Sequence, residues 1–230
     1  MSDASREPSR RDARRRELLS KLPKAAVAAE IGVWEGRFSD VILEVTAPRE
    51  LHLIDPWLYQ PEFSNTGFGR RKFADRMEEM HQDVSLRFAA VPEVRIHRAM
   101  SGDALRGFAD GYFDWVYIDG NHNSPVVDED LALSAVKVRP GGLIAGDDYN
   151  WQAEEGAPVK TAVKALMSRL GPQARFRTFG NQYLVRLPEL EAGRDFPVAE
   201  FIKRFILLPG DPWGRPLRHP IIKGVDNGQT

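Results

Sequence analysis

From residue 25 onward, short apolar runs alternate with amphipathic stretches along the chain. This alternation is typical of repeated strand–helix units, in which helices cover both faces of a mostly parallel sheet. A chain of 230 residues is long enough to bury one such core without a second domain. We therefore expect an α/β fold with a doubly wound, mostly parallel seven-stranded sheet that ends in a C-terminal antiparallel hairpin.

The boundaries of the elements follow from apolar runs and from turn residues. Ser39 is expected to cap the first core helix, Pro48 follows its end, and Phe179-Gly180-Asn181 forms the hairpin turn. We expect strands at 25–31, 51–54, 94–98, 113–118, 143–145, 175–178 and 182–187, and helices at 39–45, 72–88, 125–136 and 159–170.

Charge divides the chain into a basic N-terminal extension, residues 1–24, and an acidic remainder. The extension has a formal charge of +4 and the remaining residues −5. The extension is expected to be flexible or helical, and a solvated, partly helical tail is favoured over a segment that binds an acidic partner. Residues 25–188 form the core domain. Residues 189–230 are a C-terminal extension that serves as a lid, an oligomer arm or a tail.

Composition excludes several classes of function. The formal net charge of −1 disfavours nucleic acid and membrane surfaces as partners. The absence of cysteine excludes disulfides, thiolate metal sites and a cysteine nucleophile. No run approaches 18 apolar residues and no apolar signal segment is present, so a cytoplasmic location is expected.

Three aspartates follow apolar runs that are expected to be buried strands. Asp119 lies in Ile118-Asp119-Gly120-Asn121-His122, and 28 positions later Asp147 and Asp148 lie in Gly146-Asp147-Asp148-Tyr149. Ligands bind at the carboxyl edge of open α/β sheets. Three carboxylates at that edge repel one another unless a cation compensates them, and a hard divalent metal ion would do so.

A glycine motif opens the first strand–helix connection, with Gly32 and Gly36 in Glu30-Ile31-Gly32-Val33-Trp34-Glu35-Gly36. Its G-x-x-x-G spacing differs from the dinucleotide fingerprint, which disfavours a nicotinamide oxidoreductase. Asp55 ends the second strand, where a carboxylate accepts hydrogen bonds from ribose hydroxyls. Ser101-Gly102-Asp103 follows the third strand and is either an adenine-edge contact or an ordinary turn.

Together these motifs resemble the class I S-adenosylmethionine-dependent methyltransferases, which have a Rossmann-like fold. The residues that carry the resemblance span about residues 25–187: Glu30-Ile31-Gly32 with Gly36, Asp55, Phe113 to Gly120, and Pro140-Gly141-Gly142. Ile118-Asp119-Gly120-Asn121-His122 and Gly146-Asp147-Asp148-Tyr149 are similar to the metal-dependent O-methyltransferases. Within that group the chain resembles the macrocin and mycinamicin sugar methyltransferases, and it resembles the catechol O-methyltransferases more distantly.

The resemblance implies S-adenosyl-L-methionine as cofactor and Mg²⁺, or another divalent cation, at the three aspartates. It also implies a homo-oligomer and a small-molecule acceptor with adjacent oxygens, such as a sugar diol or a catechol. The residues expected to bind the cofactor are Glu30, Gly32, Gly36, Ser39, Asp55, Ser101 and Asp103, and those expected to bind the metal are Asp119, Asp147 and Asp148.

A methyl transfer to oxygen requires a base, because an aliphatic hydroxyl is a poor nucleophile. His122 lies three residues after Asp119 and titrates near neutral pH, so we predict that it is the general base. A hydrogen-bonding role before the next helix is the alternative. Tyr149 and Trp151 line the acceptor pocket or pack in the core, and Asp130 is assigned a structural role.

Two other functions are considered. The Gly120-Asn121-His122 motif also occurs in metal-dependent phosphoesterases, but their Asp-x-His and Gly-Asp-x-x-Asp motifs are missing upstream. A methyltransferase-like binding module without catalysis is the stronger rival. It is disfavoured because such a module has no reason to keep the cofactor, metal and base residues together.

Overall fold

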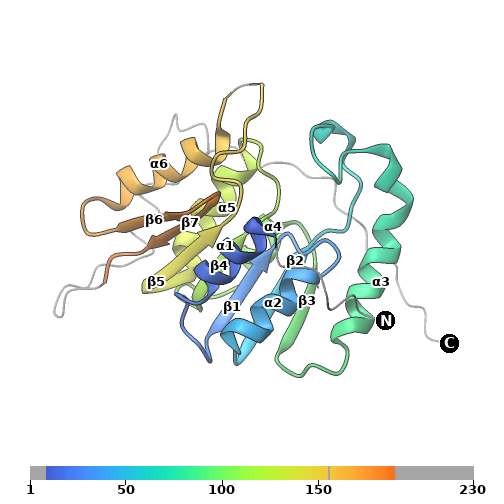
Figure 1. The fold of residues 1–230 in the computed structure, drawn as a ribbon, viewed down its shortest axis with the longest axis horizontal. Coiled ribbons are helices and arrows are strands. Elements are labelled where there is room, and N and C mark those ends of the chain that lie inside the picture. Colours follow the sequence, from blue (N-terminus) through green and yellow to red (C-terminus); the bar gives the residue numbers. More distant parts are fainter. Residues whose placement is uncertain (1–8, 155, 190–230) are drawn as a thin grey trace.

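The computed structural model describes residues 9–154 and 156–189, and seven strands within them form one twisted sheet (Figure 1). The strand order is β3-β2-β1-β4-β5-β7-β6. The first five strands are parallel, and β7 is antiparallel to both β5 and β6. The predicted fold class is confirmed. The strands are β1 (Val27–Ile31), β2 (Glu50–Asp55), β3 (Val94–Arg98), β4 (Phe113–Ile118), β5 (Val138–Gly146), β6 (Arg175–Phe179) and β7 (Gln182–Arg186).

Helices cover both faces of the sheet. One apolar cluster joins the sheet to α1, α2 and α3, and a second joins it to α4, α5 and α6. Within β4, Trp115 and Tyr117 belong to the first cluster, and Val116 and Ile118 to the second. This alternation follows from the two-residue period of a strand. The helices are α1 (Arg10–Leu19), α2 (Arg37–Thr46), α3 (Met77–Phe88), α4 (Ser101–Arg106), α5 (Val126–Lys137) and α6 (Pro158–Leu170).

The first core helix begins earlier than Ser39. Gly36 is its N-cap, with a positive φ of 71° that favours glycine. Ser39 lies inside α2, fully buried, and its hydroxyl donates a hydrogen bond of 2.5 Å to Glu30 Oε2. The predicted cap was therefore wrong, because a buried carboxyl on β1 engages the serine hydroxyl.

Three other elements differ from the expectations. The predicted helix at 72–88 is divided into a 3₁₀ segment, η2 (Arg71–Arg76), and α3. The fifth strand begins at Val138, and its register against β4 shifts between Phe113 and Trp115. Ser101-Gly102-Asp103 is not an isolated turn but begins the helix α4.

Residues 10–19 are helical, as one of the alternatives predicted, but they pack on the core instead of forming a free tail. The helix α1 begins with a capping box between Ser9 and Asp12, and its Leu18 and Leu19 are fully buried in the first cluster. Figure 1 shows α1 packed on the sheet beside α2. The proposed roles of the C-terminal extension concern residues outside the described part of the chain, except for Glu189. No helix among the described residues has the length and apolar character needed to cross a membrane.

Candidate active site

The carboxyl ends of four neighbouring strands bring the predicted site together. Ile31 of β1 is in register with Ile54 of β2 and Ile118 of β4, and Ile118 is in register with Gly146 of β5. The next residue of each strand is Gly32, Asp55, Asp119 and Asp147, respectively. These four residues therefore lie in one row at the sheet edge.

Gly32 allows the two central strand ends to approach each other. Its φ is +86°, and a Cβ atom at this position would lie 2.3 Å from the carbonyl oxygen of Asp119. Such a contact is far shorter than van der Waals distance, so any side chain here would push the first loop away from Asp119. Glycine is required by this close backbone approach.

Asp147 is the most enclosed of the three aspartates, with a side chain that is 0% exposed. Its Oδ1 accepts hydrogen bonds from Gln182 Nε2 at 2.7 Å and from the Asp148 backbone N–H at 2.8 Å. Gln182 belongs to β7, the antiparallel neighbour of β5. The C-terminal hairpin therefore fixes the orientation of this carboxylate.

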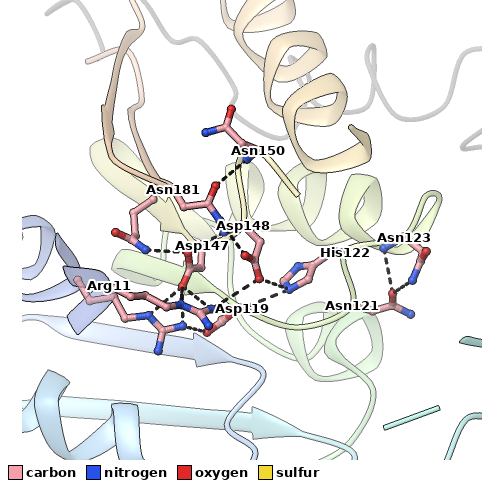
Figure 2. Close-up of polar contacts among 11 residues, drawn as sticks. Arg11, Asp119, Asn121, His122, Asn123, Asp147, Asp148, Asn150 and Asn181 are labelled. Atoms are coloured by element: carbon pink, nitrogen blue, oxygen red, sulfur yellow. Dashed lines mark hydrogen bonds and ion pairs between the residues drawn. The ribbon is translucent and has the colours of Figure 1, made fainter. Parts of the chain in front are cut away.

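Asp148 and His122 form the second part of the acidic site (Figure 2). His122 Nε2 lies 3.0 Å from Asp148 Oδ2 and 3.8 Å from Asp119 Oδ1. The other Asp148 oxygen accepts a 2.8 Å hydrogen bond from Asn181 Nδ2, at the hairpin turn. Asp148 has a left-handed backbone, φ 56°, an uncommon conformation that functional sites often retain.

Two arginines of α1 reach the aspartates from the opposite side. Arg15 donates to Asp147 Oδ2 from Nε at 2.8 Å and from a terminal nitrogen at 2.5 Å, and it also contacts Asp119 Oδ2. Arg11 donates twice to the same Asp147 oxygen, at 3.0 and 2.8 Å, and lies 3.6 Å from Asp148 (Figure 2). The arginine pair Arg11/Arg15 thus supplies positive charge to the acidic site.

The pKa values of the site groups reflect burial and these charges. Burial raises the pKa of Asp119 to about 6, although Arg15 opposes the shift. Asp147 is also buried, but Arg15 and Arg11 outweigh burial and hold its pKa below the ordinary value. Burial favours neutral His122, yet its hydrogen bond to Asp148 and the charge of Asp119 raise its pKa overall.

A cavity of about 90 Å³, which we call the inner cavity, extends from this edge beneath the loops after β1, β2 and β4. Asp55 lines it, and both of its oxygens accept backbone hydrogen bonds: Oδ2 from Val33 and Trp34, at 2.9 and 3.0 Å, and Oδ1 from Trp57 at 2.7 Å. Asp55 therefore holds the glycine loop and the segment after β2 together. Its contact with a ribose stays a prediction.

A second, wider hollow of about 450 Å³, the outer cavity, lies on the other side of Asp119. Its lining includes Arg15, His122 and Trp151, together with part of the segment at 56–71. Gly32, Trp34, Phe68, Asp119 and Gly120 line both cavities. Asp119 therefore lies where the two cavities meet.

The other residues that were predicted to bind the cofactor are divided between the two cavities and positions outside both. Gly32 and Ser101 line the inner cavity, whereas Glu30 lies on the outer one and is bonded to buried Ser39. Neither Gly36 nor Asp103 lines either cavity. The Asp103 side chain is 65% exposed and lies 3.8 Å from Arg106.

Several residues of the site were not predicted. Arg11 and Arg15 are four positions apart in a helix, a spacing that places both side chains on one face, and this was the available signal. Asn181 and Gln182 contact the aspartates only because β7 pairs beside β5, and no local pattern reveals that. Asp130 was assigned a structural role, but it is buried and lines the inner cavity.

The sequence profile of a family of methyltransferase domains matches residues 29–149. The match includes the end of β1, the glycine loop and all three aspartates, and it covers more than half of the chain. The chain therefore belongs to this methyltransferase-domain family. A search of curated proteins found no match.

Solved structures show the same fold. An O-methyltransferase family protein from Burkholderia thailandensis aligns over 76% of this chain, with a TM-score of 0.50 and 12% identity, and this chain spans 56% of its length. A Corynebacterium glutamicum protein gives a TM-score of 0.54 at 15% identity over 82% of this chain and 85% of its own. A Staphylococcus aureus protein described as a caffeoyl-CoA O-methyltransferase gives 0.52 at 13% identity, over 80% and 84%. The resemblance to class I methyltransferases is confirmed. These matches do not distinguish the macrocin and mycinamicin branch from other methyltransferases.

Proposed function

We propose that this protein is an S-adenosylmethionine-dependent O-methyltransferase that acts on a hydroxyl of a small molecule with adjacent oxygens. The position of Asp119 carries the proposal, because this residue lies between the inner and outer cavities with His122 beside it. A methyl donor in the inner cavity and an acceptor in the outer cavity would meet at this point. Membership of a methyltransferase-domain family supports the donor.

The reaction requires alignment and removal of one proton. The acceptor hydroxyl would give its proton to His122, its oxygen would form a bond to the methyl carbon, and the carbon–sulfur bond would break to leave a neutral thioether. Asp148, 3.0 Å from His122 Nε2, would stabilise the imidazolium that results. Trp151, whose ring centroid is 5.7 Å from that of His122, would form one wall for the acceptor.

The residues also fit a divalent cation. One possible ligand atom from each of Asp119, His122 and Asp148 lies within 4.8 Å of the others. Carboxylate oxygens are the ligands that Mg²⁺ and Mn²⁺ prefer, so Asp119 and Asp148 would hold such an ion, with Asp147 available after release of the arginines. A bound dication would lower the energy of the developing alkoxide.

Adjacent oxygens are proposed for the acceptor because such a cation would accept two of them as ligands. A sugar diol and a catechol both satisfy this condition. Acceptor selection is assigned to the segment 56–71, since its Asn65, Thr66 and Phe68 line the outer cavity. A homo-oligomer and a cytoplasmic location stay predictions.

The proposal is tested by calorimetric binding of S-adenosylmethionine, followed by methyl transfer to glycosides, catechols and macrolide-like acceptors with and without a chelator. We expect donor binding, transfer to a vicinal diol, and a loss of about 10²- to 10⁴-fold in turnover for His122→Ala. Donor binding should persist in that variant, which separates catalysis from folding. Absence of donor binding, with or without Mg²⁺, would refute the function. Full activity after thorough metal removal would refute only the proposed role of the divalent cation.

A further inference from the structure

Asp130 lies on α5 at the wall of the inner cavity, and it is 1% exposed. Neither of its carboxyl oxygens has a hydrogen-bond partner of ordinary geometry among the described residues. Burial raises its pKa to about 7, against the opposing influence of the Ser101 side chain nearby. The carboxyl is thus buried beside empty space without a full set of polar contacts.

Such a carboxyl has a free-energy cost, because burial removes water and the Ser101 side chain replaces its contacts only in part. The two acidic neighbours on the same helix have partners. Asp128 accepts a hydrogen bond of 2.5 Å from Ser124, and Glu129 pairs with Arg106. An unsatisfied group in a native structure calls for an explanation, and a ligand that supplies the missing contacts is one.

The position of the carboxyl indicates which part of a ligand it would meet. A Cβ atom on Gly120 would lie 3.8 Å from Asp130 Oδ2, so only a glycine separates the carboxyl from the β4 edge. Ser101 and Val126 are the first residues of α4 and α5, and both line the inner cavity. Asp55, at the end of β2, also lines it. With a ribose at Asp55, the base would extend toward Asp130.

We propose that Asp130 recognises the purine base of the methyl donor through the amino group and adjacent ring nitrogen of adenine. A protonated carboxyl offers one O–H donor and one carbonyl acceptor, and the adenine edge offers a ring-nitrogen acceptor beside an amino donor. The two edges are complementary. This inference rests on the proposed function, and it replaces Asp103, which is exposed, as the acidic residue at the adenine edge.

The test compares two ligands, S-adenosylhomocysteine and S-(1-deazaadenosyl)homocysteine, by calorimetry. The deaza compound keeps the amino group but has a C–H in place of the adjacent ring nitrogen, so the carboxyl O–H would have no acceptor at that edge. We expect the wild type to prefer the adenosyl ligand by about tenfold or more. Asp130→Leu should lose about tenfold in adenosyl affinity and most of this preference, whereas Asp130→Asn, which can mimic the neutral carboxyl, should bind within about threefold of the wild type.

Asp128→Asn is the matched control, because it changes an acid on the same helix that does not line the cavity. The melting temperature of ligand-free Asp130→Leu should equal or exceed that of the wild type, since an unsatisfied buried acid is removed. Unchanged adenosyl affinity in Asp130→Leu would overturn the inference. Equal binding of both ligands to the wild type would also overturn it, even if the variant failed to fold. Failure of both ligands to bind the wild type would instead refute the proposed function.

Discussion

Glu30 is a carboxyl on the central strand β1, and it is 1% exposed. Burial raises its pKa to about 8, while the hydrogen bond from Ser39 opposes the shift and the charge of Asp119 adds to it. In the unfolded chain this group titrates near its ordinary value of 4.5. Between these two pH values the folded protein binds a proton that the unfolded chain releases.

We therefore predict that Glu30 makes the protein less stable as pH rises from about 4.5 to about 8. The loss from this group is at most about 1.4 kcal/mol per pH unit. Glu30→Gln, which keeps the shape without the charge, should flatten this dependence and be more stable than the wild type at pH 8. Urea unfolding of the ligand-free protein at pH 5, 6.5 and 8 measures the effect.

Glu79→Gln is the control for this experiment, because Glu79 is exposed on α3. It should follow the wild-type pH dependence throughout. A pH dependence of Glu30→Gln that matched the wild type would show that Glu30 is ionised in the folded state.

At the residue scale, the three aspartates were predictable because each follows an apolar run that had to be a buried strand. Their meeting at one edge follows from the parallel sheet. The partners of Asp147 were not predictable. Gln182 and Arg15 lie 35 and 132 positions away, and only tertiary packing brings them to its carboxylate.

At the scale of elements, α1 places two arginine side chains beside the acidic site. Leu18 and Leu19 anchor one end in the apolar core, and the arginine pair Arg11/Arg15 projects from the other end toward Asp147. Arg15 also lies over the Phe38 ring, with 4.5 Å to its centroid. A guanidinium and a divalent cation would both be attracted to the same carboxylates, so we expect them to compete.

Arg15→Ala should therefore bind Mn²⁺ about tenfold more tightly than the wild type, as measured by calorimetry or electron paramagnetic resonance. Without metal the same variant should melt at a lower temperature, because removal of one partner leaves buried carboxylates uncompensated. Mn²⁺ should restore more of its stability than it adds to the wild type.

Arg14→Ala is the matched control, since Arg14 lies on the same helix but pairs with Glu17 at the surface. Arg11→Ala is a milder variant, because the Arg11 side chain is 53% exposed, and it should show the same trend. Equal Mn²⁺ affinity in the wild type and both site variants would exclude competition. A lack of Mn²⁺ binding in the wild type and in all variants would instead contradict the proposed divalent-cation site.

At the scale of the whole molecule, the inner cavity joins segments that are distant in sequence. Its lining includes Ile31, Asp55, Met100 and Asn121, which belong to or follow β1, β2, β3 and β4. A ligand in this cavity would contact the ends of four strands at once. Because these strands belong to one sheet, binding should stabilise the described core as a unit.

We predict that S-adenosylhomocysteine raises the melting temperature of the protein. At a ligand concentration about 100 times Kd, the folded state gains about 2.7 kcal/mol, which corresponds to an increase of several degrees. Differential scanning fluorimetry over a range of ligand concentrations measures the shift, with ligand-free buffer and S-(1-deazaadenosyl)homocysteine as comparisons. A melting temperature independent of ligand concentration would contradict a donor site in the inner cavity.

The sequence by itself determined the class of fold and the approximate site, because strand period, glycine turns and strand-end carboxylates are local properties of the chain. Tertiary structure alone decided the surroundings of those carboxylates. The arginine pair on α1 and the amide groups of the C-terminal hairpin reach the site across large sequence separations. Their contacts depend on which surfaces pack together, and no pattern within a single segment encodes that choice.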